Sequence, residues 1–191
     1  MRAYIVHGWD GNPDEPVLKW LRLELEKLGW EVTAPAMPDP GTPTIESWVQ
    51  KLKEIIDNPS EDTVLVGHSV GCQACLRYVE TLPEETKIRG LALLAPWMEL
   101  DQQTIEEEGE EVVEIARPWM ETPIDFEKVK RLVGKSVAIF SDNDPFVSLT
   151  QVEVFKNKLG AETLIEHGMG HFSPSDNVSE LPSLLKVVLG F

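Results

Sequence analysis

Residues 63–71, Thr-Val-Leu-Val-Gly-His-Ser-Val-Gly, are the stretch that decides the fold. An apolar run over 63–66 leads into a turn in which two glycines flank Ser69, and helical spacing follows over 70–82. This order predicts a buried strand, a sharp turn and a helix, with the serine at the apex. The two glycines predict that strand and helix approach closely beneath a strained serine. Such a turn exposes a hydroxyl group at a helix N-terminus, where backbone N–H groups stabilise negative charge.

The same alternation of strand and helix is predicted along the rest of the chain. Apolar runs predict strands at 2–6, 31–34, 63–66, 88–95, 136–140 and 162–166. Helical spacing and capping residues predict helices at 17–28, 45–56, 70–82, from the Asp125 cap through Leu132, at 147–159, and at the C-terminus to near Leu189. Short strands rich in Val, Ile and Leu between helices predict a mostly parallel six-stranded sheet covered on both faces. The expected fold class is therefore α/β, a three-layer α/β/α sandwich.

The composition suits one globular domain over residues 1–191. The chain is 42% hydrophobic and 26% charged, and its length allows a substantial core. Residues 97–124 differ in character from the alternating elements, and we expect a small cap-like insertion there. Within it, the acidic run 106–111 is expected to be a solvated helix face.

Charge and hydropathy exclude several classes of partner. There are 33 acidic and 17 basic residues, for a formal net charge of −16, so the chain should repel nucleic acids and anionic membranes. No apolar run approaches the roughly 20 residues that span a bilayer. The N-terminal residues turn polar too quickly for a signal peptide, which predicts a cytoplasmic protein.

Chemically useful residues follow the predicted strands at their carboxyl ends. They are His7 and Gly8 after the first strand, Ser69 after the third, Asp142 and Asp144 after the fifth, and His171 after the sixth. The carboxyl ends of parallel strands meet at one edge of a sheet, where sites in such folds form. We therefore expect these residues to share one site.

A serine nucleophile needs a base, and the base needs an acid to hold its tautomer. His171, in a glycine-flanked loop after the last strand, is the expected base, and His167 is the alternative. His68 adjoins the serine, so we expect its side chain to point away from the cleft and to form hydrogen bonds behind the turn. His7 is expected to shape the neighbouring loop through its backbone.

The acid is expected from the loop Ser-Asp-Asn-Asp-Pro at 141–145. Asp144 is favoured, because Asp-Pro opens the next helical segment, and Asp142 is the alternative, with a turn or cap role otherwise. The oxyanion hole requires two backbone N–H donors. These are expected from Val70, directly after the nucleophile, and from Trp9, in the loop after the first strand.

Two further groups of residues allow two interpretations each. Trp9, Trp97 and Trp119 either form a hydrophobic substrate wall or pack the cap onto the core, and Trp97 and Trp119 are taken as candidate pocket residues. Arg117 either binds a substrate carboxylate or, as we expect, pairs with neighbouring glutamates.

No metal or cofactor is expected. The pair Cys72 and Cys75 has redox or metal spacing, but it stands on the helix after Ser69 with no second ligand pair, so we expect it to pack in the core. There is also no phosphate-binding glycine loop.

The chain resembles the small serine hydrolases related to retinoblastoma-binding protein nine and the bacterial YdeN proteins. The resemblance spans essentially the whole chain and rests on Met37-Pro38-Asp39-Pro40, Gly67-His68-Ser69, Arg117-Pro118-Trp119, Asp144-Pro145-Phe146 and Gly170-His171-Phe172. It implies a compact α/β-hydrolase fold that lacks the first strands of larger members. It also implies a catalytic triad of Ser69, Asp144 and His171.

Together, these patterns predict a serine hydrolase that cleaves small carboxylic esters or amides through an acyl-enzyme. Its partner would be a small-molecule substrate, and nothing in the sequence indicates a protein partner. One alternative is a non-catalytic protein-interaction module on a hydrolase scaffold. Another is a thioesterase or perhydrolase that uses the same triad.

Overall fold

The structure is a computed structural model of the chain and describes residues 1–100, 104 and 109–191. Six strands form one sheet in the order β2-β1-β3-β4-β5-β6, and every neighbouring pair in it is parallel. The strands are β1 (Arg2–Val6), β2 (Glu31–Thr33), β3 (Thr63–His68), β4 (Ile88–Leu94), β5 (Val133–Ser141) and β6 (Glu162–Glu166). The predicted six-stranded sheet is confirmed, and all of its pairings are parallel.

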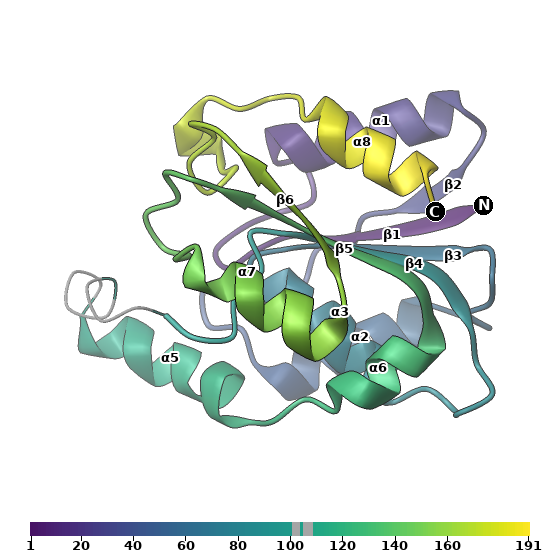
Figure 1. Cartoon of the computed structure of the whole chain (residues 1–191), viewed down its shortest axis with the longest axis horizontal. Helices are drawn as coiled ribbons and strands as arrows, with labels where there is room; N and C mark the ends of the chain where they lie inside the picture. The colour runs from purple at the N-terminus through teal and green to yellow at the C-terminus, as the bar shows by residue number, and fades with distance from the viewer. Residues whose placement is uncertain (101–103, 105–108) are drawn as a thin grey trace.

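Helices cover both faces of this sheet, which confirms the three-layer sandwich (Figure 1). The described helices are α1 (Pro16–Lys27), α2 (Ile45–Ile55), α3 (Val70–Glu80), α5 (Glu110–Glu121), α6 (Phe126–Leu132), α7 (Thr150–Val154) and α8 (Pro182–Leu189). Helices α1 and α8 lie together on one face, whereas α2, α3 and α6 lie on the other. Each parallel crossover therefore brings the chain back to start the next strand at the same edge.

The central strand β3 and the helix after it form the middle of the core. Every residue of β3 is buried, since β1 and β4 flank it and helices cover both faces. Helix α3 packs against β3, α2 and α6, and it is buried over Val70–Val79. Burying a large aliphatic side chain stabilises the fold by about 1.5–3 kcal/mol. The turn between β3 and α3 is thus held between two buried elements.

One predicted helix begins later than expected. The helix predicted over 147–159 begins at Thr150, and its second half, Phe155–Leu159, is a π-helix. Before it, Asp144 Oδ1 accepts the N–H groups of Phe146 at 2.9 Å and Val147 at 3.0 Å. This local side-chain turn holds the segment in a loop, because it offers the backbone an alternative to helical hydrogen bonds.

The segment 97–124 is described only in part. Residues 106–108 of the acidic run lie outside the described residues, whereas Glu110 and Glu111 are exposed in the first turn of α5. At the other end of α5, Arg77 of α3 donates to the carbonyls of Trp119 at 3.1 Å and Thr122 at 2.7 Å. A guanidinium group at the last carbonyls of a helix is favourable, so this contact ties the end of α5 to the core.

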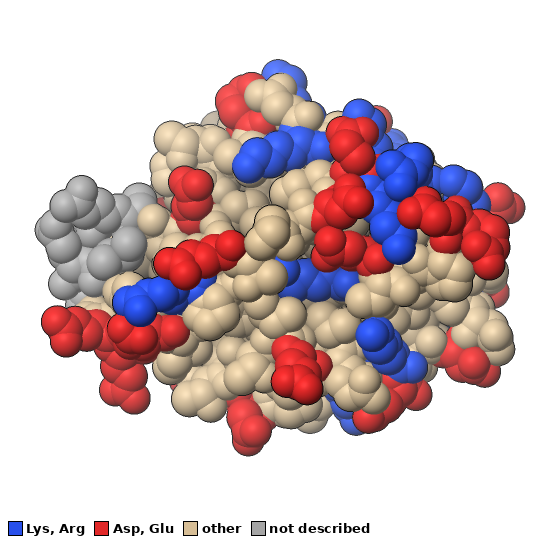
Figure 2. Space-filling model, turned by 90° about the horizontal axis from the view of Figure 1, so that it is seen from below, with Lys and Arg blue, Asp and Glu red and all other residues tan. Residues whose placement is uncertain are grey.

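Charged side chains of both signs are interspersed over the face that Figure 2 shows. Arg117, a candidate for binding a substrate carboxylate, instead pairs with Glu114 at 2.8 Å on an exposed face of α5. The pairing with a neighbouring glutamate is therefore confirmed. Within the described ranges, no helix is both long enough and apolar enough to cross a membrane.

Candidate active site

Ser69 occupies the strained turn that the sequence predicts. Its backbone has φ +52° and ψ −123°, in the left-handed half of the map where a non-glycine residue is strained. A Cβ atom on Gly71 would lie 2.6 Å from the Val6 carbonyl oxygen, and one on Gly67 would lie 2.7 Å from Cys72 Cα. Only glycine fits at either position. The Ser69 N–H also donates to the Leu94 carbonyl at 2.9 Å, so the turn is anchored to β4.

The loops after β5 and β6 bring a carboxylate and an imidazole together in a buried pair. Asp144 Oδ2 lies 2.8 Å from His171 Nδ1, and the two side chains are 1% and 11% exposed. A carboxylate only accepts hydrogen bonds, so the imidazole hydrogen on this side belongs to Nδ1. The other ring nitrogen, Nε2, is then free to accept a proton. The structure therefore brings together the acid and the base that the sequence favours.

The two alternatives to these residues form a second pair with each other. Asp142 Oδ2 lies 2.6 Å from His167 Nδ1, with side chains 39% and 85% exposed. Asp142 Oδ1 also accepts the N–H of Gly168. The hydrogen bond from His167 lowers the pKa of Asp142, and the same bond raises the pKa of His167. This pair lies at the surface and neither of its residues is among those that line the cavity around Ser69.

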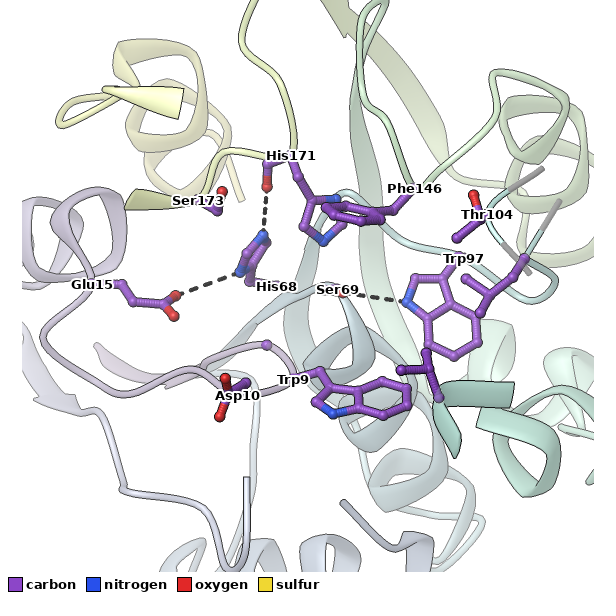
Figure 3. A pocket seen from close by; sticks show the side chains of 13 residues that line it. Trp9, Asp10, Glu15, His68, Ser69, Trp97, Thr104, Phe146, His171 and Ser173 are labelled. Atoms are coloured by element: carbon purple, nitrogen blue, oxygen red, sulfur yellow. Dashed lines mark hydrogen bonds and ion pairs between the residues drawn. The ribbon is translucent and has the colours of Figure 1, made fainter. Parts of the chain in front are cut away.

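Ser69 and His171 line one cavity of about 420 Å³. Figure 3 shows Ser69 between two kinds of wall, with aromatic side chains on one side and polar side chains on the other. The apolar lining residues are Trp9, Trp97, Leu100, Val112 and Phe146. The polar ones include Asp10, Glu15, His68 and Ser173. None of the described lining residues is Lys or Arg, which suits an uncharged or cationic ligand better than an anion.

The three candidate tryptophans do not share one role. Trp97 lines the cavity, and its indole Nε1 lies 3.3 Å from Ser69 Oγ. Trp9 lines the cavity as well, while its indole N–H donates to the Gly41 carbonyl. The expectation that Trp119 is a pocket residue is wrong. It is fully buried, packs edge-on against Trp48 and donates to the Pro43 carbonyl, because α5 turns this face toward the core.

The loop after β1 passes directly over the serine. A Cβ atom on Gly8 would lie 3.1 Å from Ser69 Cβ, which brings the backbone of Trp9 to the site. His7 shapes this loop through its side chain, not through its backbone alone as expected. Its Nε2 accepts the Met37 N–H at 3.0 Å, so its Nδ1–H donates to the Gly8 carbonyl at 2.8 Å. Burial lowers the pKa of His7, which favours the neutral ring that both bonds require.

His68 does not point away from the cleft, contrary to expectation. Its ring lines the cavity, and its Nε2–H donates to the His171 carbonyl at 2.8 Å, across 103 residues of sequence. On its other side, Nδ1 lies 3.6 Å from a carboxylate oxygen of the buried Glu15. Burial acts to raise the pKa of Glu15, but the His68 ring, together with His7 and the backbone at Asn12, outweighs it and lowers that pKa. His68 thus supports the loop that carries His171.

Glu15 and Phe146 are site residues that sequence reasoning missed. Phe146 packs edge-on against the His171 ring at 5.1 Å between centroids. The motif Asp-Pro-Phe contained this residue, but its contact with the imidazole depends on the turn that Asp144 makes. Glu15 carried no local signal, because an acidic residue before a helix is ordinarily exposed.

The cysteine pair is part of the core. Cys72 and Cys75 are free and buried, and burial raises the pKa of both thiols. The expectation that they pack in the core is confirmed. Within the described residues, no group of three or more His, Cys, Asp and Glu side chains could hold a metal ion.

Two relatives are similar in sequence to nearly the whole of this chain. YdeN of Bacillus subtilis (strain 168) is 24% identical over 191 residues, covering 100% of this chain and 95% of YdeN. The serine hydrolase RBBP9 of Rattus norvegicus is 27% identical over 184 residues, covering 95% of this chain and 85% of RBBP9.

Solved structures show the same fold. The crystal structure of the ydeN gene product of Bacillus subtilis has a TM-score of 0.88 at 23% identity, covering 99% of this chain and 97% of that one. A second crystal structure, of an α/β superfamily protein from Xanthomonas campestris, has a TM-score of 0.64 at 16% identity. It covers 100% of this chain and 99% of that one. The family described as serine hydrolase matches residues 3–189. Because this match spans nearly the whole chain, the protein belongs to the serine hydrolase family.

Proposed function

We propose that this chain cleaves small carboxylic esters or amides through an acyl-enzyme on Ser69, with His171 as base and Asp144 as the acid that holds it. One observation carries the proposal: His171, paired at 2.8 Å with the buried Asp144, lines the same cavity as Ser69, which is held in a strained turn. A binding module has no need for this combination, since a buried carboxylate and a strained backbone both cost stability.

Acylation begins when Ser69 Oγ attacks the substrate carbonyl carbon. The hydroxyl proton passes to His171 Nε2 as the new Oγ–C bond forms, and Asp144 stabilises the resulting imidazolium. The backbone N–H groups of Trp9 and Val70 are proposed to hold the oxyanion. The tetrahedral intermediate then expels the alcohol or amine, which takes the proton from His171.

Deacylation repeats these steps with water as the nucleophile. His171 Nε2 takes a proton from the water as its oxygen bonds to the acyl carbon. The C–Oγ bond then breaks, and Ser69 Oγ leaves with the electron pair and recovers a proton from His171. The products are a carboxylic acid and the free enzyme.

The volume and the lining of the cavity support the proposal that the substrates are small and have an apolar part. Its volume of about 420 Å³ lies at the low end of ligand pockets, and aromatic and aliphatic side chains make one of its walls. A panel of p-nitrophenyl esters, anilides and thioesters of acetate, butyrate and phenylacetate separates the ester, amide and thioester chemistries that the triad could perform.

The test is labelling with a fluorophosphonate probe, followed by mass spectrometry of the adduct. We expect the adduct on Ser69, and we expect Ser69→Ala to lose both the label and ester turnover, by about 10⁴-fold or more. Ser179→Ala, at an exposed serine, is the matched control and should keep both. Folded wild-type protein without an adduct would overturn the proposal in favour of the non-catalytic interaction module.

A further inference from the structure

The indole of Trp97 contacts the oxygen that would react. Trp97 follows β4 at its carboxyl end, its side chain is 2% exposed, and its Nε1 lies 3.3 Å from Ser69 Oγ (Figure 3). An indole nitrogen only donates hydrogen bonds, so the serine oxygen is the acceptor. The hydroxyl hydrogen of Ser69 is then available for another acceptor, and His171 Nε2 is the acceptor that the triad provides.

Two buried glutamines hold the backbone that carries this indole. Gln73 Nε2 donates to the Trp97 carbonyl at 3.0 Å, and Gln151 Oε1 accepts the N–H of Met98 at 2.9 Å. Arg77 donates to Gln73 Oε1 at 3.2 Å, which fixes the direction of that amide. Gln73 stands on α3, the helix that begins directly after Ser69, so one rigid element sets the positions of both the serine and the indole. The donor is therefore preorganised and does not need to move during a reaction.

Other tryptophans of this chain donate their indole hydrogen bonds to the backbone. Trp9, Trp48 and Trp119 donate their indole N–H groups to the backbone carbonyls of Gly41, Pro38 and Pro43. A backbone carbonyl is an ordinary partner for a buried indole. In Trp97 the same group is directed at a side-chain oxygen, and that oxygen belongs to the strained turn.

We propose that the Trp97 indole N–H is a catalytic hydrogen-bond donor to Ser69 Oγ, a role that rests on the proposed function. In the free enzyme it fixes the serine oxygen and leaves the hydroxyl hydrogen directed to His171. In deacylation the C–Oγ bond breaks and its electron pair moves onto Oγ, which is protonated by His171. The indole N–H stabilises this departing oxygen while negative charge develops on it. The apolar walls of the cavity strengthen the effect, because a hydrogen bond is stronger in a medium of low dielectric constant.

The kinetic test is Trp97→Phe, which keeps an aromatic ring but removes the N–H donor. For a p-nitrophenyl ester we expect kcat to fall about tenfold, the loss of one hydrogen bond of ordinary strength, with KM changed less than about twofold. Trp119→Phe is the matched control. It also removes an N–H bond from a buried indole, but one outside the cavity, so it should lower stability while leaving kcat unchanged.

A second measurement leaves Trp97 in place and so does not depend on how Trp97→Phe folds. In ¹⁵N-labelled protein, the assigned indole N–H resonance of Trp97 should shift upfield and exchange faster in Ser69→Ala than in wild type. The Trp119 resonance should stay unchanged in the same comparison. An unmoved Trp97 resonance would overturn the proposal.

The two proposals fail in different ways. If wild-type protein labels on Ser69 and Trp97→Phe keeps full kcat, the indole has no catalytic role although the serine hydrolase function stands. If folded wild-type protein neither labels nor hydrolyses any ester, amide or thioester, the proposed function is wrong, and the catalytic role of Trp97 is wrong with it.

Discussion

The loops after β5 and β6 meet in two aspartate–histidine pairs that look alike and lie in different surroundings. Asp144 and His171 approach to 2.8 Å, Asp142 and His167 to 2.6 Å, and each bond joins Oδ2 to Nδ1. The first pair is almost fully buried and its His171 lines the cavity of Ser69, while the second pair faces solvent. Distance alone therefore does not distinguish the buried pair from the surface ion pair.

Burial gives the two pairs different strengths. In water, ions are well solvated and screened, so an exposed pair contributes little. In a buried pair each group depends on its partner, because neither can be solvated when the partner is removed. The buried pair can thus hold one tautomer and one ring orientation, which a catalytic base requires.

The largest expected effect separates the two aspartates by activity. Asp144→Asn should lower kcat for a p-nitrophenyl ester by about 10³–10⁴-fold, because an amide can hold His171 in the wrong tautomer. Asp142→Asn removes the equivalent carboxylate from the exposed pair and should change kcat less than about twofold. Equal losses in the two variants would contradict the comparison, and a larger loss in Asp142→Asn would move the acid to Asp142.

A smaller effect is expected on stability. Asp144→Ala removes the acceptor of the Phe146 and Val147 N–H groups together with the partner of His171, all in a buried site. The free energy of unfolding should fall by about 1–3 kcal/mol. Asp142→Ala exposes its former partners to water and should cost less than about 1 kcal/mol. Urea denaturation at pH 7 measures both values, and a greater loss in Asp142→Ala would show that burial does not set the strength of the pairs.

The comparison also shows what sequence can predict. The strand, turn and helix around Ser69 are encoded within nine residues, so their positions follow from glycine sterics and apolar periodicity. The contact between Asp144 and His171 follows from topology, since parallel strands bring successive loops to one edge. Their role as acid and base stays a prediction.

What the sequence leaves open depends on contacts between distant segments. Glu15 and His68 meet 53 residues apart, and nothing near either residue indicates the contact. The side that Trp119 faces depends on how α5 is tied to Arg77, which a local pattern does not contain. Similarly, the late start of α7 follows from the carboxylate of Asp144, which also accepts a hydrogen bond from His171.

The smallest expected effect is a pH dependence confined to the exposed pair. The pKa of His167 is raised above its ordinary value of 6.5, and the pKa of Asp142 is lowered from 3.8. The contribution of His167 to stability is fully present below about pH 6.5 and is lost as pH rises through its raised pKa. The contribution of Asp142 is present above about pH 4 and is lost as pH falls through its lowered pKa. The pair is therefore most favourable between these limits.

An NMR titration of the His167 ring checks this in wild type and in Asp142→Asn. The midpoint should fall toward the ordinary value in the variant, and added salt should lower it in wild type, because an exposed pair is screened. Activity should not follow this titration. If ester hydrolysis instead rose and fell with the protonation of His167, the exposed pair would take part in the reaction, and burial would not be the property that selects the catalytic histidine.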